Sequence, residues 1–228
     1  MNGYLGVEPM ATTTNTFMTK VYNWMSVALL ISGGLAYYIG TNIAILKMIM
    51  PYFIPLIILE LVVVMILSWA INRIGFIVAI ILFIIYSALN GITLSVIFQV
   101  YTGAMIANTF IITAGTFLFM SAYGYYTKAD LTGFGTFLIM GLFGLILASI
   151  VNFFLKSNMF DYILSWAGVL IFTGLIAYDT QKIKQIGEGV GTSSSDGINK
   201  RAIIGALALY LDFINLFLFI LRLFNRRD

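Results

Sequence analysis

Seven apolar runs of about 20 residues, joined by short polar stretches, constrain this 228-residue chain more than any other feature. A helix of that length is about 30 Å long and matches the hydrocarbon core of a bilayer. The predicted spans are 21–39, 52–71, 74–99, 104–125, 134–155, 162–183 and 202–221. We therefore expect an all-α integral membrane protein with seven transmembrane helices.

The composition agrees with this class and narrows the chemistry. Charged residues make up 9% of the chain, against roughly 25% in a soluble domain. Cys and His are absent, which excludes disulfides and the usual Cys or His metal ligands and leaves the carboxylates to supply any pH response. We expect no cofactor, and without a basic stripe we expect no nucleic-acid partner.

The chain divides into a polar N-terminal tail, 1–19, and a single transmembrane domain, 20–228. Seven basic residues fall on the same face as the N-terminus and five on the other. The seven are Lys20, Arg73, Lys128, Lys182, Lys184, Lys200 and Arg201, and the five are Lys47, Lys156, Arg222, Arg226 and Arg227. Basic residues favour the cytoplasmic face, so this excess predicts a cytoplasmic N-terminus in the cell membrane. A polar loop, 187–199, is predicted to join the last two spans.

The last span carries a carboxylate, Asp212, about half-way along its length. An acid at that depth costs about 2.5–3.5 kcal/mol on insertion scales, whereas leucine costs nothing. Asn215 lies three residues on and shares the same helix face. The two side chains form either a hydrogen-bonded clamp between helices or a site for protons or cations.

Two more carboxylates, Glu60 and Asp179, lie within predicted spans, and no Lys or Arg lies at comparable depth. Buried carboxylates that lack a counter-ion take up protons, share a proton or bind a cation. Glu60 could instead accept hydrogen bonds from a neighbouring span. Asp179 could instead be an ordinary acid at a helix end beside Lys182.

If Asp179 and Asp212 meet, they form a latch that is held closed by a shared proton and is pushed apart when both acids ionise. Asp179 lies about four residues from the polar loop and Asp212 about eleven. This offset of about seven residues is ~10 Å along straight antiparallel helices. The pair therefore requires tilt, a longer helix or a helix break.

Enzyme chemistry finds little support in the sequence. Tyr178-Asp179 matches half of the aspartate pattern of intramembrane proteases, but no Gly-x-Gly precedes Asp212. The last two spans have no interior lysine for a Schiff base, and the glycines near 187–191 have no following Gly-Lys-Ser/Thr. We expect the protein not to be an enzyme.

Two blocks in combination, Tyr178-Asp179-Thr180-Gln181 and the segment 209–215 (Leu-Tyr-Leu-Asp-Phe-Ile-Asn), carry a family resemblance. The chain resembles the bacterial branch of the Bax inhibitor family over about residues 16–228. The resemblance implies a seven-helix bundle whose last helix is central and is wrapped by the other six. It also implies a pH-sensitive calcium leak in which Asp179 and Asp212 are sensor and gate and contact calcium in the open state.

The resemblance further implicates an acid of the second span and an arginine just after it, for which Glu60 and Arg73 are the candidates by position. Asn215 joins them as a further residue of the pore or gate. Our preferred hypothesis is a cation leak channel in the lipid bilayer, gated by protonation of Asp179 and Asp212. The alternatives are a non-conducting protein that binds other membrane proteins or a membrane protease, and a proton-coupled transporter.

Overall fold

The computed structural model describes residues 10–71, 73–189 and 195–224, and all the regular elements in that part of the chain are helices. The elements are α1 (Met10–Gly40), α2 (Ile43–Ile49), the 3₁₀ turn η1 (Met50–Tyr52), α3 (Phe53–Ala70), α4 (Phe76–Leu94), α5 (Ile97–Val100), α6 (Gly103–Tyr126), α7 (Thr132–Leu155), α8 (Asn158–Glu188) and α9 (Ser195–Phe224). Six stretches are long and apolar enough to cross a membrane, and α1 is the seventh long helix. The predicted class and the count of seven are confirmed.

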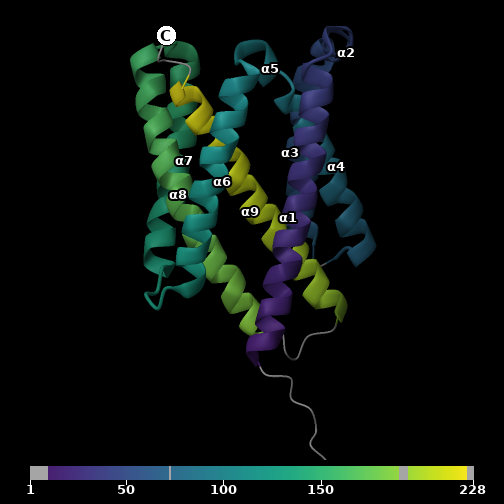
Figure 1. Cartoon of the computed structure of the whole chain (residues 1–228), viewed down its shortest axis with the longest axis vertical. Helices are drawn as coiled ribbons and strands as arrows, with labels where there is room; N and C mark the ends of the chain where they lie inside the picture. The colour runs from purple at the N-terminus through teal and green to yellow at the C-terminus, as the bar shows by residue number, and fades with distance from the viewer. Residues whose placement is uncertain (1–9, 72, 190–194, 225–228) are drawn as a thin grey trace, which may run out of the picture.

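The helices form a bundle that α9 crosses obliquely from one end to the other (Figure 1). α9 contacts α1, α4, α6 and α8, whereas α3 packs on α4 and α7 packs on α8 at the outside. Tyr210, Leu209 and Leu216 of α9 are fully buried. The last helix is therefore central as expected, with four of the other six long helices in direct contact along its length.

Small residues allow the closest helix contacts in the bundle. A Cβ added at Gly91 of α4 would lie 2.7 Å from the carbonyl oxygen of Ser32 in α1. A Cβ at Gly124 of α6 would overlap the backbone of Ala177 in α8. Close backbone approach through small residues is the usual packing of membrane helices, because lipid supplies no hydrophobic drive to associate.

Two spans differ in detail from the sequence prediction. The second begins earlier, because the Asn42 side chain accepts hydrogen bonds from Ala44 N and Ile45 N and caps a short helix, α2, before the proline-containing turn η1. The third breaks after Leu94, where the Ser95 hydroxyl donates to Ile92 O at 2.6 Å and competes with the regular helical bond. Both departures occur at a polar side chain that hydrogen-bonds to the backbone.

The ends of the last two long helices correct the predicted polar loop 187–199. α8 continues to Glu188 and α9 begins at Ser195, so helix occupies much of that range, and residues 190–194 lie outside the described residues. A tertiary contact accounts for the extension of α8, since Gly187 packs against Phe17 of α1. α1 itself begins at Met10, so half of the polar segment 1–19 belongs to the first helix, and residues 1–9 lie outside the described part.

Candidate functional site

Asp212 lies on the buried length of α9, with 5% of its surface exposed. Its Oδ2 atom is buried and has no hydrogen-bond partner in the described part of the chain. A carboxylate oxygen removed from water without a partner is costly, so this group requires a proton or a cation nearby. The sequence analysis singled out Asp212, and the structure shows it buried with one carboxylate oxygen that has no hydrogen-bond partner among the described residues.

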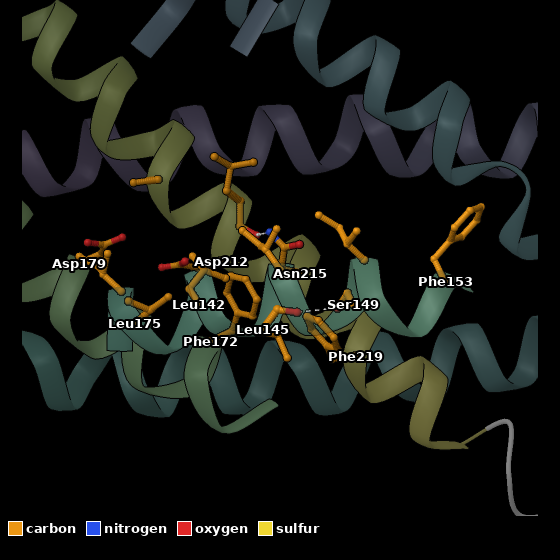
Figure 2. Close-up of a pocket in the computed structure, with 15 residues that line it drawn as sticks. Leu142, Leu145, Ser149, Phe153, Phe172, Leu175, Asp179, Asp212, Asn215 and Phe219 are labelled. Atoms are coloured by element: carbon orange, nitrogen blue, oxygen red, sulfur yellow. Dashed lines mark hydrogen bonds between the residues drawn. The ribbon is translucent and has the colours of Figure 1, made fainter. Parts of the chain in front are cut away.

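The carboxyl group of Asp179 on α8 lies close enough to that of Asp212 for the two to interact electrostatically. Figure 2 shows the two carboxyl groups together at one end of a cavity. α9 crosses the bundle obliquely, so the ~10 Å offset expected for straight antiparallel helices does not keep the acids apart. The positive charge of Lys182, one turn further along α8, attracts the carboxylate of Asp179.

The cavity beside the two acids has a volume of about 720 Å³ and lies between α7, α8 and α9. We call it the lateral cavity. Its walls are mostly apolar side chains, including Leu142, Phe172 and Phe219. Its polar groups are Ser149, Asp179, Asp212 and Asn215. The acids therefore line an otherwise apolar space between helices.

A second cavity of about 310 Å³ lies where α8 ends and α9 begins. We call it the basic cavity, because Lys182, Lys200 and Arg201 line it. Asp179 and Ala208 line both cavities, so the two spaces meet at this pair of residues. Together they follow α9 from Gly197 to Phe219, which is about 33 Å at 1.5 Å per residue and close to the thickness of the hydrocarbon core.

Asn215 lies one turn from Asp212 and lines the lateral cavity, as the shared helix face predicted. Its side-chain N–H donates to Leu211 O at 2.8 Å in its own helix. The side-chain amide of Asn215 therefore donates this hydrogen bond within α9 and not to a neighbouring helix. Asn215 is thus placed beside the acids as a lining residue.

Glu60 lies apart from the two aspartates. Its carboxylate accepts hydrogen bonds from Asn90 Nδ2 at 2.5 Å and from Thr93 Oγ1 at 3.0 Å, both on α4. The Tyr210 hydroxyl of α9 donates to the other end of the Asn90 amide, at 2.8 Å. The structure brings Glu60 into this network, which joins α3, α4 and α9, and does not bring it to the lateral or basic cavity.

Arg73 lies in the turn between α3 and α4, where its side chain is exposed. Neither cavity includes it. Lys200, which lines the basic cavity, donates to Ile74 O at 3.2 Å in the same turn. Among the basic residues used for the orientation, Arg226 and Arg227 lie outside the described residues.

Within residues 10–71, 73–189 and 195–224, no group of three or more Asp, Glu, His or Cys side chains could hold a metal ion. Two carboxylates supply fewer oxygen ligands than the six to eight that calcium takes. An ion beside this pair would therefore keep part of its water shell.

Several lining residues escaped the sequence analysis. Ser149 of α7 resembles any serine in a span, and its hydroxyl donates to Leu145 O within the same helix. Ala208 carries no chemical signal at all, although it lies where the cavities meet. A spacing of four residues from Asp212, which places Ala208 on the same helix face, was the one available clue.

Comparison with known proteins finds a family model and relatives that match nearly the whole chain. Residues 14–228 match a family model described as "Inhibitor of apoptosis-promoting Bax1". The "Inner membrane protein YbhL" of Escherichia coli K12 is 48% identical, over 97% of this chain and 95% of that protein. A protein of Borreliella burgdorferi is 46% identical over 93% of both chains, and one of Deinococcus radiodurans is 38% identical over 93% of this chain and 91% of its own length.

Proposed function

The chain belongs to the Bax inhibitor family of membrane proteins, and from this premise we propose that it is a pH-sensitive cation leak channel rather than an enzyme. The carrying observation is that two cavities follow α9 over about 33 Å and meet at Asp179, beside Asp212. Measured along the oblique helix α9, this length is comparable to the ~30 Å thickness of the hydrocarbon core. Among the described residues, Asp179 and Asp212 are the only acids that line the two cavities.

The gate works through the charge of the two acids. When Asp179 and Asp212 share a proton, a hydrogen bond joins the two carboxyl groups. This bond holds α8 and α9 together at the point where the cavities meet. When both are ionised, like charges at close range in a low dielectric repel strongly and push the helices apart. The leak therefore rises as the pH rises.

Calcium is the proposed cargo, since it is a hard cation that prefers oxygen ligands. In the open state the ionised carboxylates of Asp179 and Asp212 and the amide oxygen of Asn215 are oxygen groups that a cation could contact along the lateral cavity. The hydroxyl of Ser149 is a further oxygen group in its lining. Lys182, Lys200 and Arg201 line the basic cavity and oppose cation entry from that end. This opposition is consistent with a slow leak rather than a fast conductive pore.

The protein is reconstituted in liposomes that contain a calcium-sensitive dye, and calcium influx is followed from pH 5 to 8. The Asp179→Asn and Asp212→Asn variants cannot ionise at these positions, so each is expected to leak at a low rate that does not change with pH. Asp161→Asn is the matched control, because Asp161 lies on α8 with an exposed side chain and lines neither cavity. The control is expected to leak as the unmodified protein does.

Flux at the level of empty liposomes across the whole pH range, from protein that elutes as a folded species, would overturn the channel. The alternative is then a non-conducting protein that binds other membrane proteins. A flux that requires a second solute on one side would favour a proton-coupled transporter. Each result separates one class from the other two.

We place the protein in the inner membrane with a cytoplasmic N-terminus. The name of the Escherichia coli relative supports the location, and the seven basic residues on the face of the N-terminus support the orientation. The N-terminal and C-terminal ends of the described chain lie at opposite ends of the bundle (Figure 1). A fusion of alkaline phosphatase to the C-terminus, which is active only outside the cytoplasm, should therefore be active.

A further inference from the structure

The lateral cavity has the size and lining of a ligand site. Its volume of about 720 Å³ falls in the range of roughly 300–1,000 Å³ that is typical of small-molecule pockets. Such pockets combine apolar walls with a few polar groups that fix orientation. Here the apolar side chains come from α7, α8 and α9, and the acidic groups gather at one end (Figure 2).

Among the described residues, no Lys or Arg side chain lines the lateral cavity at its acidic end. Asp212 is 95% buried, lines the cavity and keeps an oxygen without a hydrogen-bond partner within the described residues. The basic group near the pair, Lys182, acts on Asp179 and lines the basic cavity, not the lateral one. A positively charged group that entered the lateral cavity would supply the partner that Asp212 needs.

The cavity opens toward lipid along α7. Ile146, Ile150 and Phe153 line it and are 47%, 52% and 75% exposed. Exposed apolar side chains of a membrane span face the acyl chains, so a molecule dissolved in the bilayer can enter sideways between α7 and α9. Figure 2 shows Phe153 at the end opposite the two acids.

We propose that the lateral cavity binds an amphiphilic ammonium, with its charged head at Asp212 and Asp179 and its alkyl or aryl tail along the apolar wall toward Phe153. Charge complementarity selects the head, and the apolar lining selects the tail. A neutral acyl chain would satisfy the wall but would leave the buried carboxylate oxygen unpaired. The inference does not require that the protein conducts ions, because binding can be measured without flux.

The test uses two probes with the same alkyl chain, of which one has a cationic head group and the other a neutral one. Purified full-length protein in a neutral detergent is titrated at pH 7 with dodecylamine, which is an ammonium at that pH, and separately with 1-dodecanol. Native mass spectrometry then counts the bound molecules. We expect one bound dodecylamine per chain and at least tenfold weaker binding of dodecanol.

Variants locate the site. Asp212→Asn should remove the preference for dodecylamine, whereas Asp161→Asn on the exposed face of α8 should keep it. Ile146→Trp, which fills the cavity without a change of charge, should weaken both probes. The comparison of the two probes on the unmodified protein remains decisive if a variant fails to fold.

Equal binding of dodecylamine and dodecanol would overturn the proposal and indicate a site for neutral lipid tails. An undiminished preference in folded Asp212→Asn protein would also overturn it, because the head would then lie elsewhere. Loss of calcium flux in liposomes would leave this result untouched. The two proposals can therefore fail separately.

Discussion

Tyr210 and Asp212 lie two positions apart on α9 and act on opposite sides of the bundle. The Tyr210 hydroxyl donates to Asn90 of α4, while Asp212 lines the lateral cavity against α7 and α8. Successive residues of a helix are about 100° apart, so a spacing of two turns the side chains about 200° from each other. Any rotation of α9 that separates Asp212 from Asp179 also moves Tyr210 relative to Asn90.

The first prediction concerns the hydrogen bond from Tyr210 to Asn90, which holds α9 against α4. Tyr210→Phe should lower the free energy of unfolding by about 1–2 kcal/mol, because the buried Asn90 amide oxygen loses its donor. Tyr123→Phe at an exposed position of α6 is the control and should change little. Thermal unfolding in detergent, followed by near-UV circular dichroism, measures both.

The same substitution also tests the link to the gate. If both the Tyr210–Asn90 hydrogen bond and the Asp212–Asp179 pair restrain α9, Tyr210→Phe should raise the calcium leak at a fixed pH, because one restraint on the rotation of α9 is lost. An unchanged leak in a destabilised variant would show that the Tyr210 network is structural only. The liposome assay described above provides the measurement.

The second prediction concerns the contact of α6 with α8. Gly124→Ala should destabilise the protein by about 1–3 kcal/mol, because the new Cβ overlaps the backbone of Ala177. Gly115→Ala on the same helix meets nothing within 4 Å and should stabilise slightly through its better helix propensity. Opposite signs in thermal unfolding are expected, and equal effects would contradict the contact.

The third prediction concerns the link between α6 and α7. Gln181 is buried and holds this link with two bonds: its Oε1 accepts from Leu131 N at 2.9 Å and its Nε2 donates to Ala129 O at 2.8 Å. Gln181→Leu leaves both backbone groups without these partners, at a cost of about 1–3 kcal/mol each where they remain buried.

Hydrogen exchange of the Leu131 amide measures this effect directly, and the rate should rise in Gln181→Leu. Gln185→Leu, one turn further along α8 with an exposed side chain, is the matched control. Exchange at Leu131 should be the same in that variant as in the unmodified protein. Unchanged exchange in Gln181→Leu would mean that the amide is protected by another group.

The fourth prediction concerns pH. The hydroxyl and the backbone N–H of Thr132 hold the pKa of Asp130, in the exposed α6–α7 link, below its ordinary value of 3.8. The folded-state pKa is thus below that of the unfolded chain, so the ionised carboxylate stabilises the link above the unfolded value. This contribution is lost as the pH falls through the folded-state pKa.

A ¹³C NMR titration of the Asp130 carboxyl carbon in detergent micelles measures that pKa. Thr132→Ala removes the hydroxyl but keeps the backbone N–H that donates to Asp130 Oδ1. The pKa should therefore rise in this variant without reaching the ordinary value. A pKa that does not move would show that the backbone bond alone is responsible.

The sequence predicted the number of spans and singled out one block, but it could not separate the contacts made by the residues within that block. In Tyr178-Asp179-Thr180-Gln181, four neighbouring side chains do four different things. Tyr178 packs over Gly135 of α7, Asp179 meets Asp212, and Thr180 bonds Ser121 of α6 while Gln181 holds the α6–α7 link. A helix turns each residue toward a different neighbour, and those neighbours come from distant parts of the chain.

The cavities escaped prediction for a related reason. An apolar residue such as Leu142 or Phe172 reads the same whether it fills a core, faces lipid or lines a cavity. Only the relative placement of α7, α8 and α9 distinguishes these cases. Glu60 shows the converse, since the sequence left open both an internal hydrogen bond and a role at the gate, and the structure places it on Asn90 and Thr93.

The central position of α9 has a consequence for how the chain is made. Among the described helices it leaves the ribosome last, yet Leu209, Tyr210 and Leu216 along it are fully buried. Until it arrives, the preceding helices expose to lipid the surfaces that it later covers, and Asp179 of α8 lacks its neighbour Asp212. Assembly therefore finishes as one late insertion event. Nascent chains halted before Ser195 should be marked for degradation rather than accumulate as stable partial bundles.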